Sequence, residues 1–102
     1  MGADRQAPND VRQMEQRSVM PTFDGREIEV IQFSDLAGEE WVYEFRDPAW
    51  DPNSTMLAIA VPDAGTWADA VVSINPHKGD LPLRFLEWAV RIAAERERPA
   101  EG

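Results

Sequence analysis

The chain has 102 residues, 43% of them hydrophobic, with 19 acidic against 10 basic side chains, a net charge of −9 and no cysteine. This length suits one domain with a single core, and the lack of cysteine excludes disulfides, thiolate metal sites and thiol nucleophiles. No apolar run reaches the roughly 18 residues that span a bilayer, and the N-terminal stretch has no apolar segment typical of a secretory signal, so we expect a soluble, cytoplasmic protein.

A polar N-terminal arm precedes a hairpin signal. We expect residues 1–17 to form a flexible arm, residues 18–98 a single domain and residues 99–102 a disordered tail. The dipeptide Asp24-Gly25 readily adopts the positive φ angles of a two-residue hairpin turn. The predicted cross-strand pairs are Phe23 with Arg26, Pro21 with Ile28 and Val19 with Val30. Pro21 cannot donate a ladder hydrogen bond, so the first strand should lie at an edge of the sheet.

Beyond Val30 the apolar parity shifts to Ile31 and Phe33, which predicts a bulge or a more enclosed stretch of strand. Residues 40–46 alternate strictly and form the clearest predicted strand. Residues 55–61 predict a central strand covered on both sides. Residues 66–74 are ambiguous, because Thr66 and Asp69 resemble a helix start while the following β-branched residues favour a strand. We choose a strand from Ala70, since it completes a meander.

A C-terminal helix is predicted from about Leu81 to Arg98, with Asp80 as its cap and Pro82 in its first turn. Its polar sector is narrow, and its apolar surface covers well over half of the circumference. A helix on one sheet needs an apolar stripe only a little over 100° wide. The side chains that need a further cover are Phe85, Trp88 and Ile92, and the candidates to cover them are the N-terminal arm, the Trp50 loop or a second copy of the chain.

These elements predict an α+β fold, an antiparallel meander of four or five strands with one C-terminal helix packed on one face. The side chains expected to be buried come from every predicted strand and from the helix: Val19, Ile28, Val30, Trp41, Tyr43, Phe45, Leu57, Ile59, Val61, Val72, Ile74, Leu83, Leu86 and Val90.

The surplus of acid is confined to residues 27–80, because the two ends of the chain are neutral. This stretch has only two bases, Arg46 and Lys78. Its eleven acids are Glu27, Glu29, Asp35, Glu39, Glu40, Glu44, Asp47, Asp51, Asp63, Asp69 and Asp80. Such a field repels nucleic acid and anionic lipid, so we expect neither as a direct partner. It would speed encounter with a basic protein, although the acidity could equally serve solubility alone.

No catalytic, cofactor or metal motif emerges. His77 is the only histidine, with Asp80 as the nearest orienting carboxylate, but Ser73 would lie within a strand rather than on a nucleophile turn. Asp47, Asp51 and Asn53 lack the spacing of a calcium loop. Trp50, between two Asp-Pro steps, either folds back on the core or is displayed as a recognition anchor, and we favour burial.

The leading hypothesis is a non-enzymatic binding protein (an inhibitor, an antitoxin or immunity-type factor, or an adaptor) that meets a basic protein through its sheet region. The partner-binding candidates are Trp50, Asp47, Asp51, Glu39, Glu40 and Glu44. The alternative is a homo-oligomeric structural or assembly protein, such as a homodimer, that associates through Phe85, Trp88 and Ile92 on the helix. An enzyme that uses His77 is the third hypothesis, and no cofactor is expected.

Overall fold

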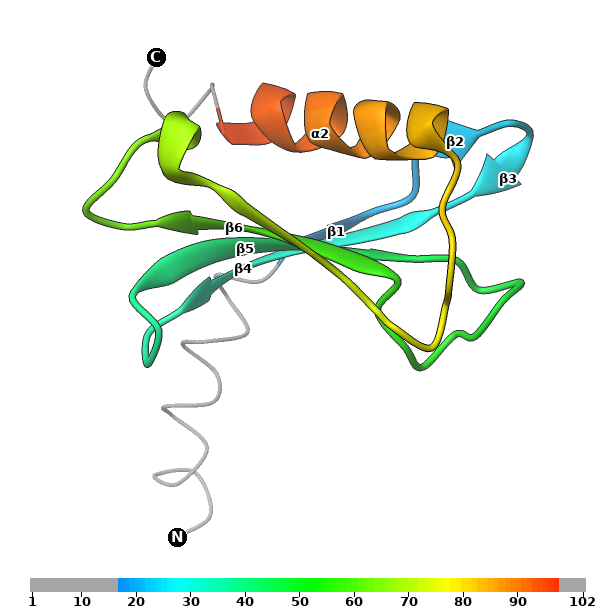
Figure 1. Ribbon diagram of the computed structural model, residues 1–102, viewed down its shortest axis with the longest axis horizontal. Helices are drawn as coiled ribbons and strands as arrows, with labels where there is room; N and C mark the ends of the chain where they lie inside the picture. Colours follow the sequence, from blue (N-terminus) through cyan, green and yellow to red (C-terminus); the bar gives the residue numbers. More distant parts are fainter. Residues whose placement is uncertain (1–16, 98–102) are drawn as a thin grey trace, which may run out of the picture.

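The computed structural model describes residues 17–97, which form an antiparallel sheet with one helix across one of its faces (Figure 1). The α+β fold and the meander are therefore confirmed, and the predictions for residues 1–16 and 99–102 lie outside the described residues. The five-stranded sheet has the order β1-β4-β5-β6-β7, and β2 and β3 pair separately. The elements are β1 (Arg17–Val19), β2 (Thr22–Phe23), β3 (Arg26–Glu27), β4 (Glu29–Asp35), β5 (Glu40–Arg46), β6 (Leu57–Pro62), the 3-10 helix η1 (Trp67–Asp69), β7 (Val71–Ile74) and α2 (Leu83–Glu97).

The first hairpin has the predicted turn and register. Asp24 and Gly25 both have positive φ angles, 53° and 77°. The Cα partners are Phe23 with Arg26 and Val19 with Val30, and the backbone N–H of Ile28 donates to the carbonyl of Pro21 (2.9 Å). β1 is an edge strand, as Pro21 predicts.

The ambiguous segment at residues 66–74 contains both of the structures that its sequence indicates. Thr66 caps η1: its hydroxyl accepts a hydrogen bond from the N–H of Ala68, and its own N–H donates to the carboxylate of Asp69 (2.9 Å). The backbone becomes extended at Ala70, and β7 follows. A capping box therefore starts a helix of only three residues, because the β-branched residues that follow favour a strand.

The core lies between α2 and the inward side of the sheet. Tyr43, Phe45, Leu57 and Ile59 are fully buried there. The rings of Phe23, Phe85 and Trp88 form an aromatic cluster that joins the β2-β3 hairpin to α2, with centroid separations of 5.1 Å (Phe23 to Phe85), 5.2 Å (Phe23 to Trp88) and 5.6 Å (Phe85 to Trp88).

Three residues predicted to be buried are exposed: Val72 by 42%, Ile74 by 44% and Leu83 by 68%. The cause is the position of α2, which lies toward the β1 side of the sheet. A guanidinium nitrogen of Arg84 contacts the carboxylate of Asp24 (2.8 Å), and further along the helix Glu95 borders a cavity together with residues of β1 and β4. One helix placed there leaves β7 uncovered.

The sequence left open whether the N-terminal arm, the Trp50 loop or a second copy covers Phe85, Trp88 and Ile92; in the structure Phe23 of the β2-β3 hairpin packs on Phe85 and Trp88. Phe85 and Trp88 are only 2% and 8% exposed, and Ile92 is half-buried against the core. The apolar surface of α2 is so wide that its pattern does not specify which part faces the sheet. The structure turns the aromatic part inward, where the β2-β3 hairpin covers it.

Candidate functional site

No described helix covers the side of the sheet away from α2. Both α2 and η1 lie on the opposite side, while the loops 47–56 and 75–80 extend toward this one (Figure 1). Because side chains alternate along a strand, the face can be assigned from the register. We call it the open face; its residues are Ser18, Glu29, Ile31, Phe33, Asp35, Glu40, Val42, Glu44, Arg46, Ala58, Ala60, Pro62, Val71 and Ser73.

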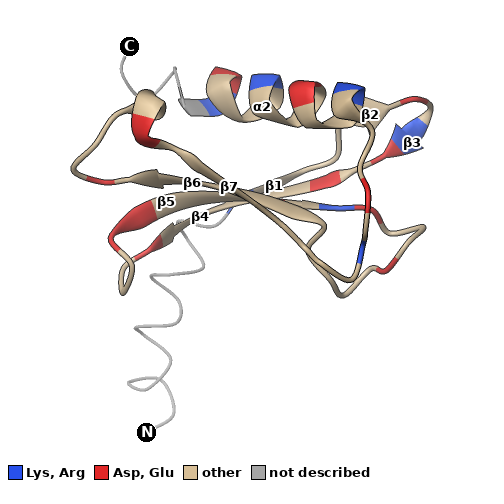
Figure 2. Ribbon diagram, viewed as in Figure 1, with Lys and Arg blue, Asp and Glu red and all other residues tan. Residues whose placement is uncertain are grey.

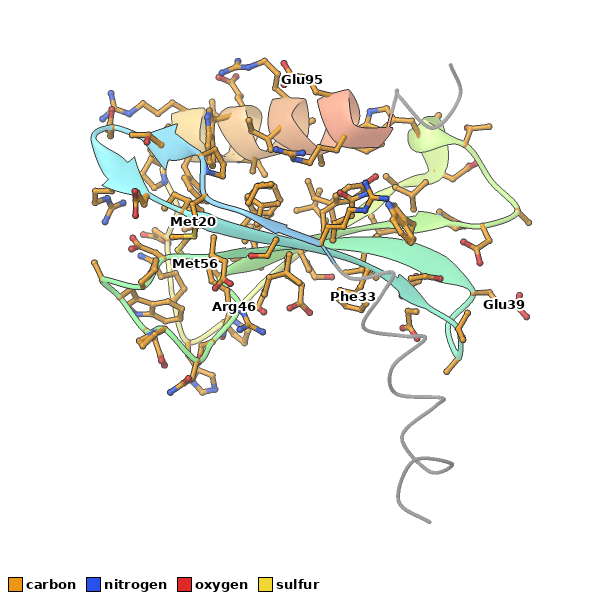
Figure 3. The ribbon with its side chains drawn as sticks, turned by 180° about the vertical axis from the view of Figure 1, so that it is seen from behind. Met20, Phe33, Glu39, Arg46, Met56 and Glu95 are labelled. Atoms are coloured by element: carbon orange, nitrogen blue, oxygen red, sulfur yellow. The ribbon has the colours of Figure 1, made fainter. Side chains whose placement is uncertain are left out.

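Apolar side chains occupy the centre of the open face. Ile31 and Val42 are buried, and Phe33, Ala58 and Ala60 are half-buried. Figure 3 shows Phe33 and Arg46 projecting from the sheet on the side away from α2. The parity shift after Val30 is thus explained without a bulge: β4 is a regular strand with apolar residues on both faces. β6 is an inner strand of the sheet, as predicted, because it lies between β5 and β7. Its expected cover on both sides is complete only on the α2 side, where Leu57, Ile59 and Val61 are buried.

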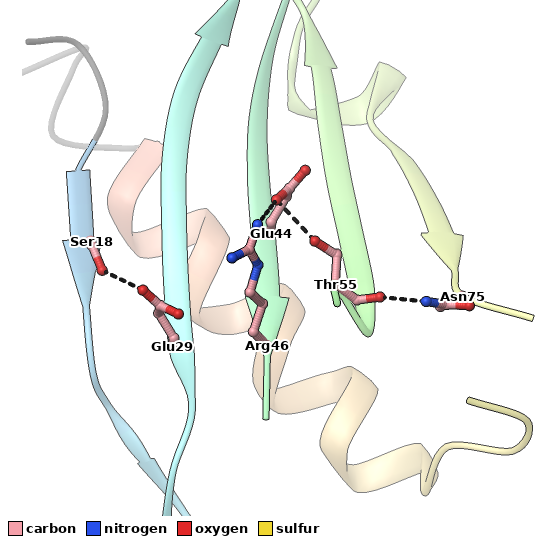
Figure 4. Close-up of polar contacts among 6 residues, drawn as sticks. All are labelled: Ser18, Glu29, Glu44, Arg46, Thr55 and Asn75. Atoms are coloured by element: carbon pink, nitrogen blue, oxygen red, sulfur yellow. Dashed lines mark hydrogen bonds and ion pairs between the residues drawn. The ribbon is translucent and has the colours of Figure 1, made fainter. Parts of the chain in front are cut away.

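Carboxylates of β4 and β5 border this apolar centre, and hydrogen bonds orient two of them (Figure 4). The hydroxyl of Ser18 donates to Glu29 (3.2 Å), and that of Thr55 donates to Glu44 (2.9 Å). Arg46, the only base on the face, contacts the same Glu44 oxygen (3.4 Å). The Nε of Arg46 is buried and has no hydrogen-bond partner. The face therefore presents carboxylates whose orientation is set by hydrogen bonds.

A second group of acids lies at the β4-β5 turn, where Figure 2 shows red segments close together. Asp35 and Glu40 are direct cross-strand partners on the open face. Glu39 between them is exposed and lies at one extreme of the molecule (Figure 3), and its carbonyl accepts a hydrogen bond from the N–H of Asp63 (2.9 Å). Like charges opposite each other destabilise a sheet, so this end of the face would be stabilised by a cationic group.

The six predicted partner-binding residues do not form one site. Glu40 and Glu44 share the open face and Glu39 adjoins it, whereas Asp47, Trp50 and Asp51 lie beyond the other end of β5.

Asp47 is not a surface residue. It is only 2% exposed, its carboxylate is 2.7 Å from a guanidinium nitrogen of Arg26, and it accepts a hydrogen bond from the N–H of Ala49 (2.9 Å). Trp50 is half-buried against the core, and the Nζ of Lys78 lies 5.8 Å from its ring centroid. The ring is thus packed against the protein, as we favoured, and these two side chains serve the fold of the loop.

The carboxylate of Asp51 is likewise engaged within its own loop. Its oxygens accept hydrogen bonds from the N–H of Asn53 (3.0 Å) and the hydroxyl of Ser54 (2.8 Å). These hydrogen bonds hold the pKa of Asp51 below its ordinary value of 3.8, and the bond from Asn53 has a larger effect than the bond from Ser54. Within residues 17–97, no group of three or more His, Asp and Glu side chains is arranged to hold a metal ion.

His77 lies in an exposed turn after β7. Its backbone N–H donates to the side-chain oxygen of Asn75 (2.8 Å), which closes a local turn. Ser73 is exposed within β7 and belongs to the open face, and Asp80 is exposed in the loop. Nothing in this arrangement adds a catalytic partner to His77.

Glu29, Asp35 and the apolar centre were not predicted from the sequence to form one surface. The sequence signal for this surface was the shift in the parity of the apolar positions, from Val30 to Ile31 and Phe33. Apolar residues on both faces of a strand, in a chain with only one clear helix pattern, indicate that one apolar face lacks a helical cover.

Within residues 17–97, the fold and the face define an α+β domain whose antiparallel sheet has a helix on one of its two sides. Comparison of the chain with protein-family models, curated proteins and solved structures finds no match. None of the helices in the described part of the chain is long and apolar enough to cross a membrane.

Proposed function

We propose that the protein is a non-enzymatic, cytoplasmic binding protein whose open face meets a basic protein partner. It would act as an inhibitor, an antitoxin or immunity-type factor, or an adaptor. The observation that carries the proposal is the open face itself, which combines an apolar centre, bordering carboxylates on β4 and β5, and no described helical cover. Protein interfaces combine an apolar core with a polar rim in this way.

The charges on the face favour a basic partner. Its acids are Glu29, Asp35, Glu40 and Glu44, against the single base Arg46, which already contacts Glu44. Charge complementarity of this kind raises the association rate and selects partners, while the apolar centre contributes affinity. Because two of the carboxylates are already oriented by hydroxyl groups, less side-chain freedom is lost on binding.

The two other hypotheses receive less support. The oligomer hypothesis relies on Phe85 and Trp88, which the fold buries. An enzyme would rely on His77, whose turn supplies no second catalytic group.

The test is a capture experiment with three versions of the full chain as bait. The first is wild type, the second carries Asp35→Asn, Glu40→Gln and Glu44→Gln, and the third carries the matched neutralisations Asp69→Asn, Asp80→Asn and Glu87→Gln away from the open face. We expect wild type and the third bait to retain one partner with a basic patch. We expect the second bait to lose it, with affinity about tenfold lower or more.

Salt dependence supplies an independent readout with the purified partner. Because the contacts are ionic, the wild-type affinity should fall as salt rises from low to physiological concentration, and the open-face variant should show a flatter dependence. The proposal would be overturned if the captured partner has no basic patch, or if its affinity for wild type does not depend on salt. It would also be overturned if the second and third baits lose affinity for the partner equally.

A further inference from the structure

The edge strand β7 lacks the features that normally protect a sheet edge. Its four residues, Val71–Ile74, are all exposed, and within the described residues it pairs on one side only, with β6. Natural edges are usually blunted by charged side chains, proline or a bulge. The other edge, β1, begins with Arg17 and is followed by Pro21, whereas β7 contains three aliphatic residues and a serine.

The outward backbone groups of β7 can be assigned from the ladder. The N–H of Asn75 donates to the carbonyl of Met56 on the β6 side (2.9 Å). In an antiparallel strand the direction of the N–H groups alternates, so those of Val72 and Ile74 point away from β6. These are the same two residues whose side chains lie on the α2 side of the sheet.

An exposed apolar surface adjoins this edge on the α2 side. Arg84 and Glu95 place the polar flank of α2 toward the β2-β3 hairpin and β1. The opposite flank, Leu83, Leu86 and Val90, therefore points away from β1. We call Val72, Ile74, Leu83, Leu86 and Val90 the β7 shoulder; the first three are exposed by 42%, 44% and 68%, and the last two are half-buried.

We propose that a second copy of this chain covers this surface, with β7 paired antiparallel to β7 across a two-fold axis perpendicular to the sheet. Such an axis keeps both α2 helices on one side of a continuous ten-stranded sheet. It requires that side chains from the same face meet, so Val72 lies opposite Val72, or Ser73 opposite Ser73. Either register brings the two β7 shoulders together, and a two-fold interface needs only this self-complementary surface.

Charge favours a second copy over a basic peptide at this edge. The β7 shoulder contains no charged side chain, and the acids of the sheet lie on the other face.

The expected dimer is weak. Stable interfaces bury on the order of 1,000 Å² or more, which two strands of four residues do not supply by backbone pairing alone. The β7 shoulder must contribute the rest, so we expect dissociation in the micromolar range.

Sedimentation of the full chain over a concentration series, from micromolar to near-millimolar, tests this inference. Wild type should convert from monomer to dimer. Val72→Lys should raise the dissociation constant about tenfold or more, because it places a charge in the apolar seam of the dimer. Val71→Lys is the matched control: it lies on the same strand but on the open face, where its charge stays in solvent, and should change the constant less than about threefold.

Hydrogen exchange of wild type tests the pairing without a substitution. The amides of Val72 and Ile74 should become protected as concentration rises, while those of Val71 and Ser73, which point toward β6, should change little. Three results would each overturn the inference. Wild type could stay monomeric over the whole concentration series, or the folded Val72→Lys variant could dimerise as well as wild type. The exchange rates of the Val72 and Ile74 amides could also be independent of protein concentration. A dimer that forms without protecting these amides would place the interface elsewhere.

Discussion

At the scale of the residue, the backbone of Glu39 is the most unusual feature of the fold. Its φ angle is +56°, although Gly38 stands next to it and Glu39 is not a residue that adopts this region easily. A left-handed conformation costs a non-glycine residue about 1–2 kcal/mol. A Cβ at position 38 would meet a carboxylate oxygen of Asp35 at 2.9 Å, and a small shift of that side chain would relieve the contact. The turn therefore places its glutamate, not the neighbouring glycine, where φ is positive.

Glu39→Gly should raise the free energy of unfolding by about 0.5–1 kcal/mol, because it removes the conformational cost at this position. Urea unfolding followed by tryptophan fluorescence measures the change. The control is Glu39→Gln, which removes the same charge and keeps the cost; if it stabilises the protein as much as Glu39→Gly does, then charge repulsion among neighbouring acids, not backbone strain, is the cause.

At the scale of the element, the small β2-β3 hairpin ties the sheet to α2. Phe23 stacks edge-on against Phe85 and contacts Trp88, while Arg84 bonds to Asp24 in the hairpin turn. Each strand of the hairpin has only two residues, and a two-stranded ribbon of this length is not stable alone. Its stability therefore depends on the aromatic cluster.

Phe23→Ala should lower the free energy of unfolding by about 2–4 kcal/mol, through lost apolar burial and a cavity beside Phe85 and Trp88. Calorimetry or urea unfolding measures the loss. Leu36→Ala, which removes an apolar side chain that is 62% exposed, should change stability by less than about 0.5 kcal/mol. Equal effects of the two substitutions would show that the hairpin is not anchored by Phe23.

At the scale of the whole molecule, the net charge of −9 is unevenly distributed. Acids and bases alternate on the outer side of α2, whereas acids prevail around the open face and the β4-β5 turn (Figure 2). Self-repulsion of such a region destabilises the compact state and weakens as salt screens it.

The double variant Asp35→Asn, Glu40→Gln should therefore be more stable than wild type at low salt, by about 0.5 kcal/mol, and the gain should shrink as salt rises. Urea unfolding at several salt concentrations measures both. Glu87→Gln on α2 removes one acid where bases are near and should give no such gain. A gain from the double variant that does not change with salt would rule out electrostatic repulsion as its source.

Most of the elements could be predicted, because the signals that specify them are local. Asp24-Gly25 specified both the turn and its register, strict alternation specified β5 to the residue, and Asp80 with Pro82 located the start of α2 within about one turn. The candidate site was predicted only in part. Glu40 and Glu44 were assigned to a binding surface and lie on the open face, but Asp47 was assigned to the same surface and is buried.

The sequence by itself determined which segments are strands, where the chain turns, that one helix closes the fold and where the surplus acid lies. These properties follow from spacing, capping and turn chemistry within a few residues. Only the tertiary structure decided that the aromatic side of α2 faces inward, that Asp47 pairs with Arg26, and that no helix within residues 17–97 covers β7 or the open face. The physical reason is that one helix is narrower than five strands. Which part of the sheet it covers depends on long-range packing of the Phe23, Phe85 and Trp88 rings, which no local pattern encodes.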